Sequence, residues 1–109
     1  MARLANKRAL ITGGGAGIGA ACARLFCAEG AAVTLVDANE EGLLATVQAL
    51  RGEFPQARIS HCAANVADAA RTRDVVQHAV DAHGGLDILV NNAAMRNYSA
   101  LADATPEEW

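Results

Sequence analysis

The chain has 109 residues and a formal net charge of −3 at pH 7, and 52% of its residues are hydrophobic but only 4% aromatic. This length predicts one domain with one core, and the apolar fraction argues against intrinsic disorder. Because acidic and basic residues are interspersed, nucleic acid and anionic membrane surfaces are disfavoured as main partners.

We expect neither a signal peptide nor a membrane span in these residues. Its first residues lack the continuous apolar stretch of a signal peptide, and nothing approaches the ~20 apolar residues of a membrane span. Three scattered cysteines, an odd number, do not resemble a disulfide framework. We therefore expect a soluble, cytoplasmic protein.

The first predicted unit is a strand followed by a helix. Residues 8–12 form a short apolar run that ends at a cluster of glycines. The apolar spacing from Ile18 to Phe26 then predicts a helix that ends at Gly30. We expect its apolar stripe, which includes Leu25, to face the core.

The same plan repeats along the chain. Strand-like segments at 32–37 and 58–64 are each followed by a helical pattern. The helical pattern after 58–64 has an apolar stripe at Val75 and Val76, which we expect to face the core. Residues 86–94 form a last strand, apolar along its length as expected when both faces are covered. The alternation predicts a parallel sheet with right-handed crossovers, an α/β fold of the Rossmann-type doubly wound class with four βα units.

The segment ITGGGAGIGA, residues 11–20, has glycine at positions 13, 14, 15, 17 and 19. Each glycine costs roughly 0.5–1 kcal/mol relative to alanine, so the cluster needs a reason. A glycine-rich turn between a strand and a helix places bare N–H groups and the positive end of the helix dipole where a phosphate can bind. The other interpretation is a loop that needs positive φ angles and binds nothing.

Three phosphate-binding patterns compete in this segment. A P-loop spacing runs from Gly14 to Gly19, but Ala20 and Ala21 follow where Lys and Ser or Thr are required. Hydrolysis of ATP or GTP is therefore disfavoured. Two dinucleotide-binding patterns do fit, one through Gly15, Gly17 and Ala20 and a wider one through Thr12, Gly13, Gly17, Ile18 and Gly19.

Asp37 is the predicted ribose-binding residue. It ends the second strand 20 residues after Gly17, where an acidic side chain accepts hydrogen bonds from the adenosine ribose. The same carboxylate would repel a 2′-phosphate, and neither Ala16 nor Ala38 supplies the Arg or Lys that such a phosphate requires. The sequence therefore favours NAD over NADP. Considered without its spacing from the glycines, Asp37 would be interpreted as a solvated residue at the end of a strand.

With these residues in place, the chain resembles the short-chain dehydrogenase/reductase family over essentially its whole length. TGGGAGIG (12–19) is similar to the family's TGxxxGIG loop, NVAD (65–68) to its DVxD segment beside the adenine, and NNAA (91–94) to its NNAG. The predicted coenzyme-binding residues are Thr12, Gly13, Gly17, Ile18, Gly19, Asp37, Asn65, Val66, Asn91 and Ala93.

The resemblance implies an NAD-dependent oxidoreductase acting on a carbonyl or alcohol substrate, in which a Tyr-x-x-x-Lys pair supplies the general acid and base. That pair cannot be placed here, because Ala102 stands four residues after Tyr98 and the only lysine is Lys7. We therefore assign no catalytic residue, and expect residues 1–109 to be an NAD-binding domain that is inactive alone.

Two further departures from the family's segments are small. Asn65 stands where Asp is common, and its amide can still donate and accept at the adenine edge. Ala94 replaces a glycine, adding one methyl group near the nicotinamide side.

The sequence ends on a helix signal. Thr105 is a candidate N-cap, Pro106 fits the first helical position and Glu108 completes a capping box. Trp109 follows directly, so we expect an incomplete domain that stops where a helix begins, with the C-terminal strands and helices of the fold missing.

Several alternatives stay open at this level. The chain could be a non-catalytic nucleotide-binding or regulatory module whose open sheet edge allows self-association, or a methyltransferase with a glycine-rich first loop, which the NNAA segment disfavours. A zinc site of Cys22, Cys27, His61 and Cys62 is disfavoured by their spacing. We expect His78 and His83 to be solvated surface residues.

Overall fold

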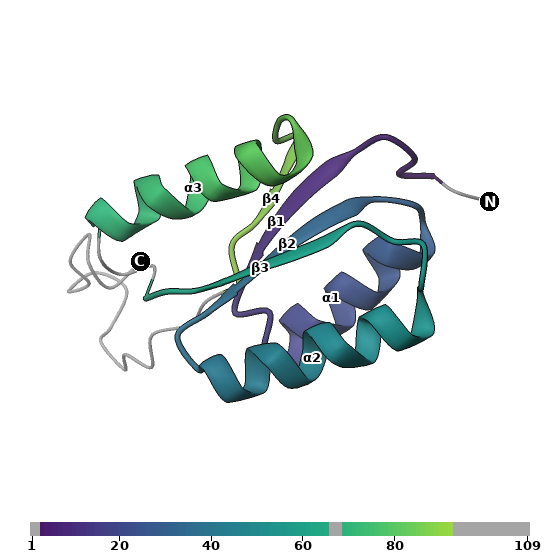
Figure 1. Cartoon of the computed structure of the whole chain (residues 1–109), viewed down its shortest axis with the longest axis horizontal. Coiled ribbons are helices and arrows are strands. Elements are labelled where there is room, and N and C mark those ends of the chain that lie inside the picture. The colour runs from purple at the N-terminus through teal and green to yellow at the C-terminus, as the bar shows by residue number, and fades with distance from the viewer. Residues whose placement is uncertain (1–2, 66–68, 93–109) are drawn as a thin grey trace, which may run out of the picture.

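The computed structural model describes residues 3–65 and 69–92, which form a four-stranded parallel sheet between helices (Figure 1). The elements in chain order are β1 (Arg8–Thr12), α1 (Gly17–Ala28), β2 (Ala32–Asp37), α2 (Glu40–Glu53), β3 (Ile59–Ala63), α3 (Ala69–His83) and β4 (Ile88–Val90). Figure 1 shows α1 and α2 on one face of the sheet and α3 on the other. The predicted Rossmann-type class is confirmed.

The strands lie in the order β3-β2-β1-β4. The chain moves outward from β1 through β2 to β3 and then returns to place β4 on the other side of β1. The order therefore reverses between β1 and β4, and in open α/β sheets ligands bind outside the carboxyl ends of the strands at such a point.

The core is built on the two central strands. Ile11, Val33 and Leu35 are fully buried among residues that pack against α1 and α2. Leu10 and Val36 are buried on the opposite face, with Val75 and Ala79 of α3. Burial on both faces explains why these strands are continuously apolar in the sequence.

Two strands are shorter than predicted. β3 lacks one residue at each end of the predicted 58–64, and β4 spans Ile88–Val90 instead of 86–94. Asp87 is drawn into a side-chain pair just before β4 begins, where its Oδ2 accepts from Arg8 Nε at 2.8 Å and from Arg8 N at 2.9 Å. The hydrogen bond from Arg8 lowers the pKa of this carboxyl. Residues 93 and 94 lie outside the described residues.

The predicted core face of α1 is right for Phe26, which is partly buried and packs against the core, but wrong for Ile18 and Leu25. Leu25 is 65% exposed and Ile18 is 72% exposed, while the buried positions of the helix are Gly19, Ala23 and Cys27. These three residues recur every four positions and have small side chains. The helix therefore packs on the sheet through its smallest residues and can approach the sheet closely. On α3 the prediction holds for Val75, which is 1% exposed, but Val76 is 36% exposed.

His83 is also not the surface residue that we expected. It ends α3 half-buried, with its Nε2 3.1 Å from the carbonyl oxygen of Val33 and 3.3 Å from Ser60 Oγ. Ser60 Oγ lies in turn 2.7 Å from the hydroxyl of the fully buried Thr34. His83 thus ties the end of α3 to the middle of the sheet. His78 is exposed as expected.

Cys27 provides a pH test of the α1 core. Its side chain is 6% exposed, and burial, followed by the charge of Glu53, raises the pKa of its thiol from 9.0 to about 11. The unfolded chain therefore ionises this thiol at lower pH than the folded chain does. The corresponding stability is fully present below about pH 9 and is lost as the pH rises toward 11.

We expect the free energy of unfolding to fall between about pH 8.5 and 10.5 by about 2 kcal/mol more in the wild type than in Cys27→Ala. Urea denaturation followed by circular dichroism at each pH measures this difference. Cys22→Ala, which leaves the buried thiol in place, should retain the wild-type slope. Equal slopes for the wild type and Cys27→Ala would contradict the assignment.

Candidate functional site

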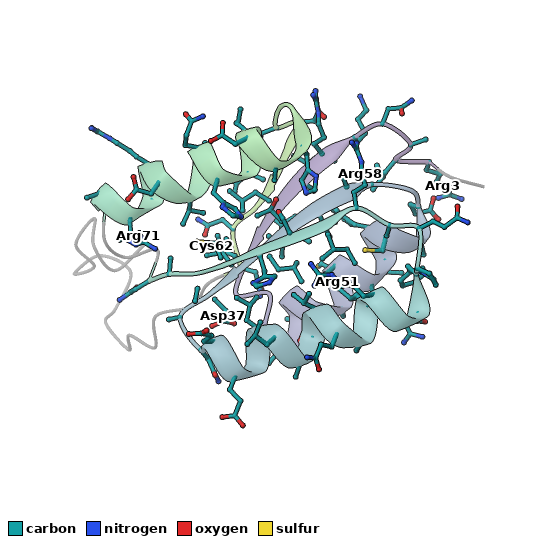
Figure 2. All side chains as sticks on the ribbon, in the orientation of Figure 1. Arg3, Asp37, Arg51, Arg58, Cys62 and Arg71 are labelled. Carbon is teal, nitrogen blue, oxygen red and sulfur yellow. The ribbon has the colours of Figure 1, made fainter. Side chains whose placement is uncertain are left out.

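The candidate site lies where the carboxyl ends of β1, β2 and β4 meet. The glycine segment follows β1, Asp37 ends β2, and Asn91 follows β4. Figure 2 shows Asp37 at this end of the sheet, close to the start of α2, while Arg58 lies at the opposite end. The parallel pairing brings together here segments that are far apart in the sequence.

The glycine segment after β1 is held by β2. Gly14 N donates to the carbonyl oxygen of Val36 at 3.0 Å, which extends the strand pairing beyond the sheet. Gly15 N donates to Asp37 Oδ2 at 2.9 Å. A side chain at position 15 would collide with this carboxylate, because a Cβ there would lie 2.7 Å from the same oxygen.

The first turns of α2 hold the same segment from the other side. Asn39 caps this helix, since its side chain accepts from Gly42 N at 3.1 Å, and its own N–H donates to Asp37 Oδ1 at 3.0 Å. One helical turn further on, Thr46 Oγ1 donates to the carbonyl oxygen of Gly15 at 3.0 Å. Gly15 is therefore bonded at its N–H by β2 and at its carbonyl by α2.

The N-terminus of α1 presents free donors beside this loop. Its N-cap residue is Ala16, which has no capping side chain, and no acidic residue lies in the first turn. Within the described part of the chain, the N–H groups of residues 16–19 have no hydrogen-bond partner. At Gly17, φ is +59° and a Cβ would meet no atom within 4 Å. Such a group of N–H donors at the positive end of a helix dipole suits an anion.

Gly19 allows α1 to start close against the loop after β1. A Cβ at this position would overlap the carbonyl oxygen of Gly13, and it would lie 2.8 Å from Asn92 Nδ2. Only a residue without a side chain fits, so Gly19 is needed for packing. This requirement stands apart from any requirement for a ligand.

Thr12 joins the ends of β1 and β4. Its side chain is buried, and its hydroxyl accepts from Asn92 N at 2.9 Å. The same oxygen lies 3.3 Å from Asn91 Oδ1 and 3.4 Å from the carbonyl oxygen of Val90. Thr12 thus holds the segment after β4 beside the glycine loop.

Most of the predicted site residues lie around this one edge. Thr12, Gly13, Gly17, Ile18, Gly19, Asp37 and Asn91 come from the ends of β1, β2 and β4 and from the start of α1. Asn65 lies two residues after β3 and is exposed. The residue between them, Ala64, donates its N–H to the carbonyl oxygen of Asp37 at 3.1 Å. Val66 and Ala93 lie outside the described residues, as do Tyr98, Ala94 and the helix expected from Thr105.

Two residues of the site, Asn39 and Thr46, are not predicted from the sequence. Asn39 precedes an apolar helical pattern, which is a recognisable N-cap signal. Thr46 gives no such signal, because its partner Gly15 is 31 residues away.

Other features of the described residues lie away from this edge. An open cavity of about 400 Å³ at the amino end of the sheet is lined by residues that include Cys27, Ala32, Phe54 and Arg58, and it shares no residue with the glycine loop. Among residues 3–65 and 69–92, no group of three His, Cys, Asp or Glu side chains could hold a metal ion. In the same part of the chain no helix is both long and apolar enough to cross a membrane.

A family model described as short chain dehydrogenase matches residues 7–109. The chain belongs to this family. A 2,5-dichloro-2,5-cyclohexadiene-1,4-diol dehydrogenase of Sphingobium indicum is 40% identical over 98% of this chain and 42% of its own.

Solved structures of other short-chain dehydrogenases share the fold. One from Burkholderia cenocepacia J2315, in complex with NADP, has a TM-score of 0.80 and is 39% identical over 97% of this chain and 43% of its own. One from Mycobacterium paratuberculosis, bound to NAD, has a TM-score of 0.79 and is 33% identical over the same shares of the two chains. Both coenzymes therefore occur among the similar short-chain dehydrogenases.

The chain spans less than half the length of these relatives, 42–43% in the three cases above. The region that the chain covers contains the glycine loop, residues 12–19, which is similar to the TGxxxGIG loop of the family. The resemblance to short-chain dehydrogenases inferred from the sequence is confirmed.

The close packing at Gly19 can be tested with a matched pair of glycine variants. Gly19→Ala should lower the free energy of unfolding by about 1–3 kcal/mol, because its methyl group overlaps the backbone of Gly13. Gly52→Ala lies in α2, where a Cβ would meet nothing within 4 Å, and should be neutral or slightly stabilising. Urea denaturation measures both, and an equal effect of the two substitutions would contradict the packing role.

Proposed function

We propose that this chain is the coenzyme-binding part of an NAD-dependent dehydrogenase or reductase acting on an alcohol or carbonyl substrate. The observation that carries the proposal is the group of unpartnered N–H donors at residues 16–19, beside a carboxylate that ends the next strand. This pairing of an anion site and an acidic residue suits the diphosphate and the adenosine ribose of one dinucleotide.

The diphosphate would lie at the start of α1. Ala16 leaves the helix without a side-chain cap, so its first N–H groups are available to phosphate oxygens. Charge-assisted bonds of this kind contribute roughly 1.5–3 kcal/mol each. At Gly17 a Cβ would meet no protein atom within 4 Å, and this open space beside the donors supports the same assignment.

Asp37 would accept the hydroxyls of the adenosine ribose. Each of its oxygens already accepts one backbone N–H, but an ionised carboxylate has about four acceptor sites. Both oxygens can therefore accept one ribose hydroxyl more. The carboxylate would repel a 2′-phosphate, and positions 16 and 38 are alanine, so neither supplies the cation that such a phosphate requires; this favours NAD over NADP.

The remaining contacts follow the family pattern. Asn65 and Val66 would lie beside the adenine, and Asn91 and Ala93 would lie on the nicotinamide side. When bound, the coenzyme supplies the hydride-accepting or hydride-donating ring. The residues of this chain hold it and fix its orientation at the point where the strand order reverses.

A second candidate function is a nucleotide-binding module that associates with another copy of itself. Among the described strands, β4 pairs only with β1, and Leu89 in β4 is 61% exposed. An unpaired strand edge of this kind favours association.

Gly17→Val tests the phosphate site. We expect it to weaken NADH binding by on the order of 100-fold, because a branched side chain at this position obstructs the N–H donors of α1. Fluorescence titration of NADH measures the loss. Gly84→Val is the matched control, since Gly84 also has a positive φ of +80° with nothing within 4 Å of its Cβ position. Retained affinity in Gly17→Val would refute the role of the loop.

The coenzyme preference can be tested at the end of β2. Asp37→Ala combined with Ala38→Arg should raise the affinity for NADP relative to NAD by on the order of 10-fold, because it removes the repelling charge and supplies a cation for the 2′-phosphate. Isothermal titration calorimetry with both coenzymes gives the ratio. Ala38→Arg alone should change it less. An unchanged ratio in the double variant would count against Asp37 as the selecting residue.

A further inference from the structure

Thr46 lies in α2, on an element that the coenzyme proposal does not use. Its hydroxyl donates to the carbonyl oxygen of Gly15 at 3.0 Å, across 31 residues of sequence. We propose that Thr46 is a positioning residue for coenzyme binding, which holds the Gly15–Ala16 peptide in its binding orientation. This inference rests on the proposed function and adds a determinant of affinity outside the glycine loop.

The geometry of the peptide links this carbonyl to a donor. None of the described peptide bonds is cis, and in a planar trans peptide the C=O and the following N–H point to opposite sides. Because the Gly15 carbonyl points to Thr46 in α2, the N–H of Ala16 points away from α2. That N–H is the first of the unpartnered donors at the start of α1. Thr46 therefore sets the direction of a group that it does not touch.

The Gly15–Ala16 peptide needs a second hydrogen bond to fix its orientation because the loop is rich in glycine. A peptide next to glycine reorients at little steric cost, so the bond from Gly15 N to Asp37 fixes only one side of this residue. The hydroxyl of Thr46 fixes the other side. With both bonds present, the Gly15–Ala16 peptide is oriented before any ligand arrives, and the ordering cost does not reduce the affinity.

The surroundings of Thr46 are shaped for this contact. Position 42 is glycine, and a Cβ there would lie 3.2 Å from the same Gly15 oxygen, so a larger residue would crowd the carbonyl. Threonine is also a poor residue for a helix interior compared with the alanine, leucine and glutamine around it in α2. A hydroxyl in a helix commonly bonds to the preceding turn of its own helix. Here it bonds to the loop instead.

The test compares two substitutions at one position. Thr46→Val keeps the branched shape and removes the hydroxyl, whereas Thr46→Ser keeps the hydroxyl. We expect Thr46→Val to weaken NADH binding about 3- to 10-fold in a fluorescence titration, and Thr46→Ser to stay within about 2-fold of the wild type. The amide signal of Ala16 in a ¹H–¹⁵N NMR spectrum should shift in Thr46→Val and return toward its wild-type position in Thr46→Ser.

Thr34→Val is the matched control. It also removes a threonine hydroxyl that makes a side-chain hydrogen bond, but its partner is Ser60 on the α3 side of the sheet. It should leave NADH affinity unchanged even where it lowers the melting temperature. A loss of affinity in Thr34→Val equal to that in Thr46→Val would mean that general destabilisation is the cause, which overturns the proposal.

The outcomes separate the inference from the function on which it rests. If the wild type binds neither NADH nor NADPH, the proposed function fails and the inference fails with it. If the wild type binds and a folded Thr46→Val binds equally well, the inference alone is overturned.

Gly42→Ala decides the case in which Thr46→Val does not fold. It retains the hydroxyl but displaces the Gly15 carbonyl, and we expect it to weaken NADH binding about 2- to 5-fold. Unchanged affinity in this variant would then overturn the proposal.

Discussion

The carboxylate of Asp37 joins parts of the molecule that are far apart in the sequence. Its Oδ2 accepts from Gly15 after β1, and its Oδ1 accepts from Asn39 at the start of α2. The backbone carbonyl oxygen of Asp37 accepts from the N–H of Ala64, which directly follows β3. The shape of the carboxyl edge of the sheet depends on Asp37, because this last residue of β2 bonds both to the glycine loop after β1 and to the segment after β3. The parallel register, which places Thr12 beside Val36 and Asp37 beside Ala63, brings these groups within reach.

This arrangement gives one side chain two tasks under the proposed function. As a structural group, Asp37 satisfies two backbone N–H donors and so holds the loop. As a recognition group, it would select the ribose by its charge and its remaining acceptor sites. The two tasks are compatible because the two N–H donors fix the orientation of the carboxylate and leave further acceptor sites on both of its oxygens. They also imply that coenzyme preference and loop order are coupled, so a change at position 37 affects both.

The sequence predicts the order and type of the elements well. The central strands β1 and β2 are buried on both faces, and each reads as an apolar run ended by a turn. It predicts the core face of α1 only in part, since Phe26 packs against the core but two other apolar residues do not. Apolar periodicity marks Ile18 and Leu25 as core residues, but the sheet accepts the helix on Gly19, Ala23 and Cys27, a face whose small residues give a weak hydrophobic signal. The role of Thr46 could not be predicted from the sequence, because its partner Gly15 is 31 residues away. The partial burial of His83 was unpredictable for the same reason, since its partners are Val33 and Ser60.

The rotation of α1 is explained by the position of its first turn. A large side chain between this helix and β1 would move the helix outward and carry its N-terminal N–H groups away from the carboxyl edge of the sheet. With Gly19 facing the backbone of Gly13, the first turn of α1 begins directly beside Thr12 and the segment after β4. The consequence is that Ile18 and Leu25, which would gain more from burial, are turned outward and remain 72% and 65% exposed. Placement of the helix N-terminus therefore outweighs burial of Ile18 and Leu25, as expected where a backbone site, and not the core, determines the packing.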